Sequence, residues 1–147
     1  NYFWAVILIA PFIFLALPLF NTYFQQYPQY QNPNIDLTTK ALRFGVFTFS
    51  TLPGWEFLHR GFMLFGIRHL LLKIKIQESI ASGLSVLVVV MSETLYHLIK
   101  PDLEAFGMLI FSPILCWFAL RTRSIWAPLI LHLYIEALFF LQISRNF

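Results

Sequence analysis

Residues 79–99 read SIASGLSVLVVVMSETLYHLI, an apolar stretch with one acidic residue, Glu93, and one histidine, His97. Crossing the hydrocarbon core of a bilayer takes about 20 apolar residues, so this stretch predicts a membrane-spanning helix. Residues four apart lie on one face of a helix. Glu93 and His97 can therefore point at a common site at membrane depth.

The composition of the whole chain agrees with a membrane protein. Hydrophobic residues make up 59% of its 147 residues and charged residues only 12%, against about 25% charged in soluble domains; the mean hydropathy is +0.70. We expect an all-α, polytopic transmembrane helix bundle of about five membrane segments, some of them broken or re-entrant. The segments cover about residues 2–20, 41–67, 79–99, 105–120 and 125–143.

Proline and glycine fall inside two of these segments. Pro53-Gly54 stands just before Glu56, where it frees backbone groups and is expected to open the helix. The stretch Leu103–Leu120 is short and contains Gly107 and Pro113. We therefore expect it to be tilted or re-entrant.

The chain divides at a polar stretch rich in Tyr, Gln, Asn and Pro. We predict that residues 1–39 form an N-terminal membrane helix and an external loop, and that residues 40–147 form a helical membrane core. Because the chain begins at Asn1 and runs directly into an apolar segment, we expect it to be a fragment of a longer protein.

The basic residues of the loops predict the orientation of the bundle. Loop 68–78 and turn 121–124 together carry five basic residues, whereas the opposite side carries four. The two basic loops are therefore predicted to be cytoplasmic.

Three pairs of ionisable side chains stand one helical turn apart within the apolar segments. Such groups are costly at membrane depth and by default mark a functional site, so three pairs predict a shared polar site. A bidentate contact from an arginine keeps a carboxylate ionised, and a carboxylate next to a histidine orients its ring. The alternative for each pair is a structural contact. The pairs are Glu56 with Arg60, Glu93 with His97, and His132 with Glu136.

Other residues receive a structural interpretation. His59 is expected to point to another face of its helix and to be interfacial or packed rather than catalytic. Cys116, alone in an apolar run, is expected to be a buried small hydrophobe. No basic block with interleaved aromatic residues occurs, so nucleic-acid binding has no support.

The motifs resemble those of the CPBP family of intramembrane proteases, which includes CAAX endopeptidases and Abi proteins. That family carries Glu-Glu-x-x-x-Arg, then Phe-x-x-x-His, then His-x-x-x-Asn on membrane helices. Here Glu56 to Arg60 match the second Glu through the Arg, and His97 matches the second-motif His. Arg121–Pro128 followed by His132 resembles the third motif, so the resemblance covers about residues 40–143.

Three residues depart from the family pattern. Trp55 stands where the family has its first Glu, Glu93 replaces the Phe of the second motif, and Glu136 replaces the Asn of the third. The chain is similar to a variant branch with Trp-Glu in the first motif and His-x-x-Lys-Pro-x-x-Glu after the second, here His97–Glu104.

The resemblance implies a membrane-embedded endopeptidase that needs no cofactor and cleaves a peptide or lipidated protein substrate next to membrane lipid. By the same resemblance, His97 binds or activates water, His132 stabilises the oxyanion, and Glu56 and Arg60 are the structural part of the first motif.

Peptide hydrolysis needs a base, oxyanion donors and an acid. Because Trp55 replaces the first Glu, the base is Glu56 in a changed role, Glu93 or Glu136, in that order of preference for the first two. An ionised Glu136 cannot donate a hydrogen bond as Asn does, so the oxyanion site requires its neutral form, which burial favours.

Two other functions remain open from the sequence. In the first, His97, His132 and Glu56 bind Zn or Fe, although the chain lacks the spacing of a strong metal signature. In the second, the protein is a non-catalytic relative that binds a partner, consistent with Trp55 in place of a catalytic Glu.

Overall fold

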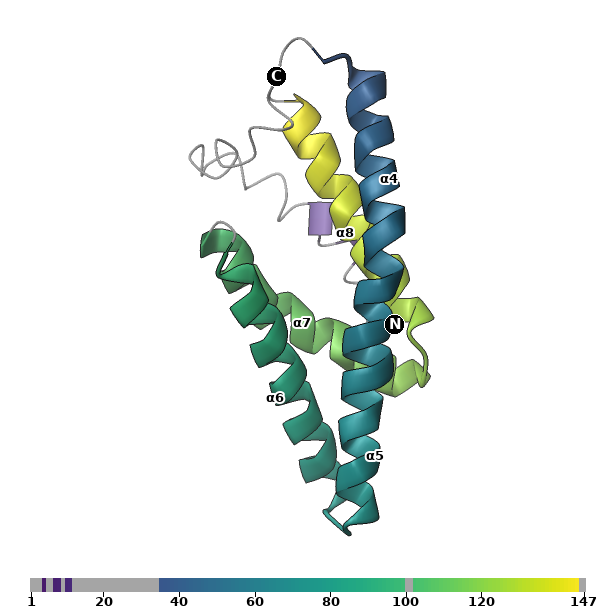
Figure 1. The fold of residues 1–147 in the computed structure, drawn as a ribbon, viewed down its shortest axis with the longest axis vertical. Helices are drawn as coiled ribbons and strands as arrows, with labels where there is room; N and C mark the ends of the chain where they lie inside the picture. Colours follow the sequence, from purple (N-terminus) through teal and green to yellow (C-terminus); the bar gives the residue numbers. More distant parts are fainter. Residues whose placement is uncertain (1–3, 5–6, 9, 12–34, 100–101, 146–147) are drawn as a thin grey trace. The chain divides into compact units, whose positions relative to one another are not determined.

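The computed structural model describes residues 4, 7–8, 10–11, 35–99 and 102–145, without the side chains of 102–104 and 142–145. All elements in these ranges are helical (Figure 1), which confirms the all-α class. They are α4 (Leu37–Glu56), the π-helix η2 (Phe57–Leu64), α5 (Phe65–Lys73), α6 (Glu78–His97), α7 (Asp102–Thr122) and α8 (Trp126–Arg145).

The chain forms two compact units. The first unit consists of Asn1–Leu52 and Ile130–Phe147, and the second unit of Pro53–Leu129. Most of the predicted N-terminal helix and polar loop lies outside the described residues. The last residues of that predicted loop, 37–39, instead form the first turn of α4.

Helix α4 begins with a side-chain cap. The Asp36 carboxylate accepts a hydrogen bond from the main-chain N–H of Thr39 at 3.1 Å, which satisfies one of the donors left open at a helix start. Hydrogen bonds from the side chain and the main chain of Thr39 lower the pKa of Asp36 from its usual range. The sequence thus fixes where this helix starts.

Within the first unit, aromatic and polar contacts join α4 and the N-terminal residues to α8. The rings of Phe44 and Phe140 stack with centroids 4.7 Å apart, and the hydroxyl of Tyr134 donates to the main-chain oxygen of Ile7 at 2.8 Å. Residues 4, 7–8 and 10–11 are helical, as expected for the start of the segment 2–20.

The predicted opening of the helix at Pro53-Gly54 is wrong. Helix α4 continues through both residues to Glu56, and helical residues follow without a break to Lys73. Proline removes only one hydrogen bond from the ladder, and membrane helices tolerate that loss. The winding changes one step later, at Phe57, where eight residues adopt the wider π-helical form. Such π-helical stretches are rare and frequently lie at functional sites.

The core of the second unit lies where η2, α6 and α7 pack together. Leu64, Val89, Cys116 and Ala119 form its fully buried cluster. Cys116 is a free thiol inside this cluster, which confirms its interpretation as a buried small hydrophobe. Helices η2 and α6, which carry Arg60, Glu93 and His97, are thus held together with α7 by apolar packing.

The prediction of a short α7 is also wrong. It runs unbroken for 21 residues from Asp102, through Gly107 and Pro113, to Thr122. Among the described residues, two helices are long and apolar enough to cross a membrane, Glu78–His97 and Ala105–Thr122, and Trp126–Leu141 is a shorter apolar helix. The number of about five membrane segments stays a prediction.

Candidate active site

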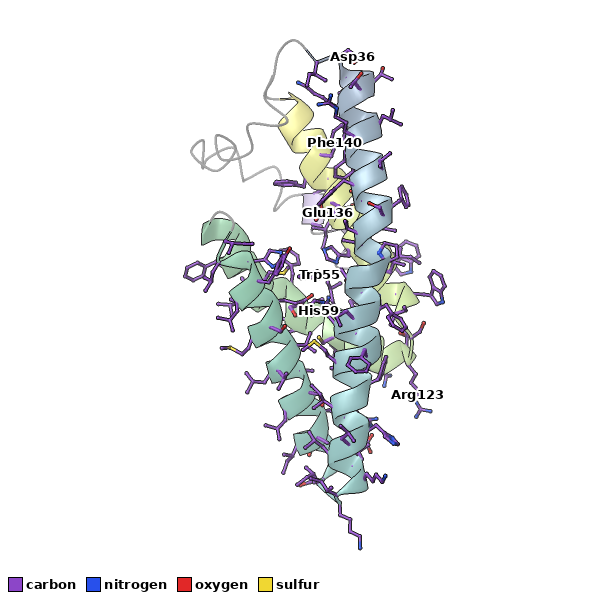
Figure 2. All side chains as sticks on the ribbon, viewed as in Figure 1. Asp36, Trp55, His59, Arg123, Glu136 and Phe140 are labelled. Atoms are coloured by element: carbon purple, nitrogen blue, oxygen red, sulfur yellow. The ribbon has the colours of Figure 1, made fainter. Side chains whose placement is uncertain are left out.

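The site residues of the first motif lie on two successive helical turns, one on each side of the α4–η2 junction. Trp55 and Glu56 end α4, and His59 and Arg60 follow one turn later in η2. Trp55 and His59 lie on the side of their helix that faces α6 (Figure 2). This arrangement brings Trp55, His59 and Arg60 against Glu93.

Glu56, Arg60 and Glu93 form a fully buried charge cluster. Nη1 of Arg60 lies 3.2 Å from Oε1 of Glu56, so the predicted pairing of these two residues is confirmed. The same nitrogen donates to Oε1 of Glu93 at 2.5 Å, and Nη2 donates to Oε2 of Glu93 at 2.7 Å. Arg60 therefore binds Glu93 with the parallel bidentate geometry that only a guanidinium provides.

Two further donors complete the surroundings of the Glu93 carboxylate. The indole Nε1 of Trp55 donates to Oε1 at 2.7 Å, and the hydroxyl of Ser112, from α7, donates to Oε2. Each oxygen of Glu93 thus accepts two hydrogen bonds, which fills the acceptor capacity of a carboxylate. The buried carboxylate of Glu93 is thus held by donors from three helical elements.

The charges of this cluster do not balance by themselves. With both carboxylates ionised, one guanidinium faces two negative charges in a region from which water is excluded. Buried ions are stable only when they are paired and hydrogen-bonded, and Glu93 has the full set of donors. Nε of Arg60, in contrast, makes no hydrogen bond within the described part of the chain, so one donor of the cluster is open to a further group.

Two histidines pack beside the cluster around Trp55. The centroid of the Trp55 ring lies 4.1 Å from the ring centroid of His59, 5.7 Å from that of His97 and 4.9 Å from that of Tyr96. Nδ1 of His97 lies 2.7 Å from the main-chain oxygen of Glu93. A histidine that donates Nδ1–H to a carbonyl leaves Nε2 as an acceptor, so this contact can fix the tautomer that a general base requires.

The structure changes the expected relation between Glu93 and His97. The residue four positions before His97 does orient the ring, but it does so through its main-chain oxygen. Its carboxylate is bound by Trp55, Arg60 and Ser112. A helix spacing of four brings a side chain next to the previous turn's carbonyl as well as next to its side chain, and the two cases cannot be separated from sequence.

His59 is packed, as expected, but the expectation that it points to another face is wrong. It is buried, and its Nδ1 lies 3.0 Å from the main-chain oxygen of Trp55 and 3.8 Å from Oε1 of Glu93. Ser112 was not predicted as a site residue at all. Its only sequence signal is a hydroxyl in front of Pro113 inside an apolar helix.

The third pair belongs to the first unit. Nε2 of His132 lies 3.9 Å from Oε1 of Glu136, and their side chains are 12% and 34% exposed. The predicted i,i+4 contact is therefore present. The predicted joint action of His132 with His97 stays a prediction.

A metal site has no support from the described side chains. Among them, no group of three or more His, Cys, Asp or Glu residues is placed to hold an ion.

A helical membrane protein with an acid–base cluster buried between its helices is the class that these features define. The chain matches the family described as type II CAAX prenyl endopeptidase Rce1-like over residues 37–138, and it belongs to that family. The resemblance drawn from the sequence motifs is thereby confirmed. No curated protein and no solved structure matches the chain.

The matched range includes every residue of the buried cluster and both histidines of the predicted chemical pair. The family is one of CAAX-type intramembrane proteases, and the two apolar helices agree with a membrane location.

Proposed function

We propose that the protein is an intramembrane endopeptidase of the CAAX-processing type, which cleaves a prenylated or otherwise hydrophobic peptide of a membrane-associated protein. One observation carries the proposal: a chain of this family buries Glu56, Arg60 and Glu93 in one ion cluster with His97 packed beside it. Burying such a cluster in an apolar bundle costs free energy, and proton transfer to a substrate is a function that requires it.

In this proposal Glu93 positions the other groups and Glu56 is the base. All four acceptor positions of Glu93 are occupied, so a proton or a water molecule at Glu93 must displace a donor. Glu56 shares Nη1 of Arg60 with Glu93. The open Nε donor of Arg60 lies in the same cluster and is suited to orient the attacking water. This assignment keeps the order of preference from the sequence and gives a reason for it.

His97 completes the water-activating site. Its ring is held by the carbonyl of Glu93 and by the Trp55 face, which orients Nε2 as an acceptor for a water proton. His132 is proposed to donate to the oxyanion, with neutral Glu136 as its partner. General acid–base groups of this kind contribute about 10²–10⁴-fold to a rate, and each oxyanion donor about 10²–10³-fold.

The test is cleavage of a fluorogenic farnesylated peptide by the purified protein in proteoliposomes. Glu56→Gln, His97→Ala and His132→Ala are each expected to lower kcat by about 10²-fold or more. His69→Ala is the matched control, because His69 is exposed and is outside the cluster. Equal activity of the wild type, His97→Ala and His132→Ala contradicts the proposal.

Treating the protein with a chelator in the same assay distinguishes the proposed peptidase from the metal-binding alternative. If Zn or Fe were bound by His97, His132 and Glu56, prolonged treatment with a strong chelator would abolish activity and re-addition of metal would restore it. We expect kcat to stay the same within error, and less than about a tenth of an equivalent of metal in elemental analysis.

The position of Trp55 favours one second candidate, a non-catalytic relative that binds a membrane partner. The indole occupies the place of the family's first Glu and hydrogen-bonds the carboxylate on α6. If this candidate holds, the wild type cleaves no peptide, and the double variant Trp55→Glu/Glu93→Phe, which has the family's residue types at both positions, gains activity. Measurable cleavage by the wild type that His97→Ala removes rules this candidate out.

A further inference from the structure

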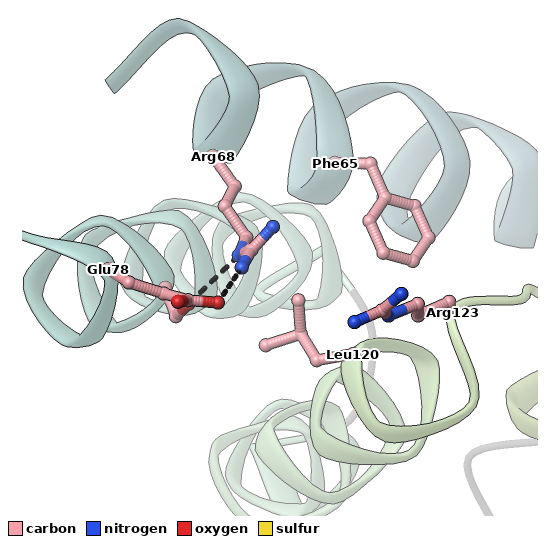
Figure 3. Close-up of a pocket in the computed structure, with 6 residues that line it drawn as sticks. Phe65, Arg68, Glu78, Leu120 and Arg123 are labelled. Atoms are coloured by element: carbon pink, nitrogen blue, oxygen red, sulfur yellow. Dashed lines mark hydrogen bonds and ion pairs between the residues drawn. The ribbon is translucent and has the colours of Figure 1, made fainter. Parts of the chain in front are cut away.

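A second polar site lies at the far end of α6 from His97, between the first half of α5, the start of α6 and the end of α7. It is a pocket of about 410 Å³ with a mixed apolar and cationic wall. Figure 3 shows Arg68 and Arg123 on two sides of it, with Phe65 and Leu120 between them. Its lining residues are Phe65, Arg68, Glu78, Ser82, Leu120 and Arg123. None of them belongs to the ion cluster described above.

The two cations of the pocket are in different states. Arg68 is already neutralised, since its Nη2 contacts the Glu78 carboxylate and its Nε donates to the hydroxyl of Ser82 at 3.0 Å. Arg123 is exposed and, within the described residues, makes no hydrogen bond or ion pair. The pocket therefore carries one uncompensated positive charge.

The backbone holds Arg123 in place at a cost. Its φ angle is +52°, the left-handed conformation that glycine usually supplies after the end of a helix. The main-chain N–H of Ser124 donates to the oxygen of Ala119 at 3.2 Å, which closes the end of α7 in the Schellman manner. A non-glycine residue is disfavoured in this conformation, so the backbone that places Arg123 at the pocket runs against the local preference of the chain.

The same pattern recurs at the end of α5. Lys75 has a φ of +64°, and Ile76 N–H donates to Leu71 at 3.0 Å. Among the described residues, Lys75 and Arg123 are the non-glycine positions with positive φ, and both are basic. Both lie in the two loops that the charge distribution predicts to be cytoplasmic.

The pocket also lies at the right depth for a headgroup. Glu78 begins one membrane-capable helix, and Thr122, next to Arg123, ends the other. The wall combines the apolar side chains of Phe65 and Leu120 with the guanidinium groups of Arg68 and Arg123. A lipid offers matching chemistry, because its acyl chains lie next to its phosphate. Arginine binds phosphate oxygens with its planar fork.

We propose that this pocket binds the phosphate group of an anionic phospholipid, held by Arg123 and, through partial exchange with Glu78, by Arg68. The bound lipid connects the first half of α5, the start of α6 and the end of α7. This inference does not rest on the proposed peptidase function, because it uses none of the residues of that site.

The test measures the thermal unfolding of the purified protein in detergent with added short-chain phosphatidylglycerol, phosphatidylcholine or inorganic phosphate. We expect phosphatidylglycerol to raise the unfolding temperature in a saturable way and the other two to leave it unchanged at the same concentration. Stabilisation by phosphatidylcholine to the same degree, or by inorganic phosphate alone, overturns the assignment to an anionic lipid.

Two variants with opposite expected effects make the test specific. Arg123→Gln is expected to weaken phosphatidylglycerol binding about fivefold, the factor for about 1 kcal/mol per basic residue at an anionic surface. Glu78→Gln removes the competing carboxylate and is expected to tighten binding. Arg121→Gln is the matched control, since Arg121 is exposed two residues earlier and does not line the pocket. An equal change in Arg121→Gln and Arg123→Gln contradicts the proposed site.

Discussion

The indole nitrogen of Trp55 donates a hydrogen bond to Oε1 of Glu93 at 2.7 Å. By the resemblance of the sequence motifs, position 55 corresponds to the family's first Glu and position 93 to its Phe. On that correspondence we infer that the carboxylate and the aromatic ring have exchanged helices, because the contact between α4 and α6 still joins one carboxylate to one ring. We therefore treat the two departures as one coupled change.

The exchange predicts strong coupling between positions 55 and 93. Trp55→Glu alone places two carboxylates against each other, and Glu93→Phe alone removes the bidentate partner of Arg60. Each single variant is expected to lower the free energy of unfolding by about 3–5 kcal/mol. The double variant is expected to lose clearly less than the sum. Additive losses in denaturant titrations of the micelle-bound protein would show that the two positions are independent.

The hydrogen bond from Trp55 to Glu93 is expected to make its own contribution to the free energy of unfolding. Trp55→Phe keeps a ring in place but leaves a buried carboxylate with one donor fewer. Hydrogen bonds to charged groups contribute about 1.5–3 kcal/mol, and we expect a loss of stability in that range. Trp126→Phe is the control, because Trp126 is 67% exposed; a comparable loss in both variants argues against a specific role for the indole N–H.

Arg60 and Glu93 are expected to behave as one buried unit. Arg60→Met leaves both carboxylates without their guanidinium and should cost about 3–5 kcal/mol. Adding Glu93→Gln to Arg60→Met should recover part of that loss, because it removes one uncompensated charge. A double-mutant cycle on thermal or denaturant unfolding measures this coupling, and a coupling energy near zero contradicts the buried ion pair.

Ser112 should matter although it lies in the middle of an apolar helix. Its hydroxyl donates to Oε2 of Glu93, so Ser112→Ala is expected to destabilise the protein by about 1–3 kcal/mol. Ser85→Ala offers a matched control, since the Ser85 hydroxyl is equally buried but donates to the main-chain oxygen of Ala81 in its own helix. We expect the Ser112 variant to lose more stability than this control.

The start of α4 should depend on pH through Asp36. The pKa of this carboxyl is lower in the folded protein than in the unfolded chain, so its stabilising contribution is present above its unfolded pKa of about 3.9. That contribution is lost as the pH falls through the lower folded value. The measurement is the protection factor of the Thr39 N–H, its exchange rate relative to that of an unstructured peptide at the same pH, and we expect this factor to fall over the acidic window in the wild type. In Asp36→Ala the protection factor should be low at every pH, and an unchanged protection factor there would contradict the cap.

The sequence by itself determined the helical class, the family and the local contacts one turn apart. Apolar length sets which segments form membrane helices, and a spacing of four places Glu56 beside Arg60 and His132 beside Glu136 regardless of the rest of the fold. The family motifs consist of the same short spacings, so they can be recognised from the sequence without a structure.

Only the tertiary structure decided which of these faces meet. Glu93 was assigned to His97 from their spacing, yet its carboxylate binds Arg60, Trp55 and Ser112 on three other helical elements. The continuous winding through Pro53 and the change to a π-helix after Glu56 were also visible only in the structure, where η2 packs against α6 and α7. Periodicity fixes the direction of a side chain on its own helix. The partner it reaches depends on how helices cross, which side-chain volumes and buried charges determine together.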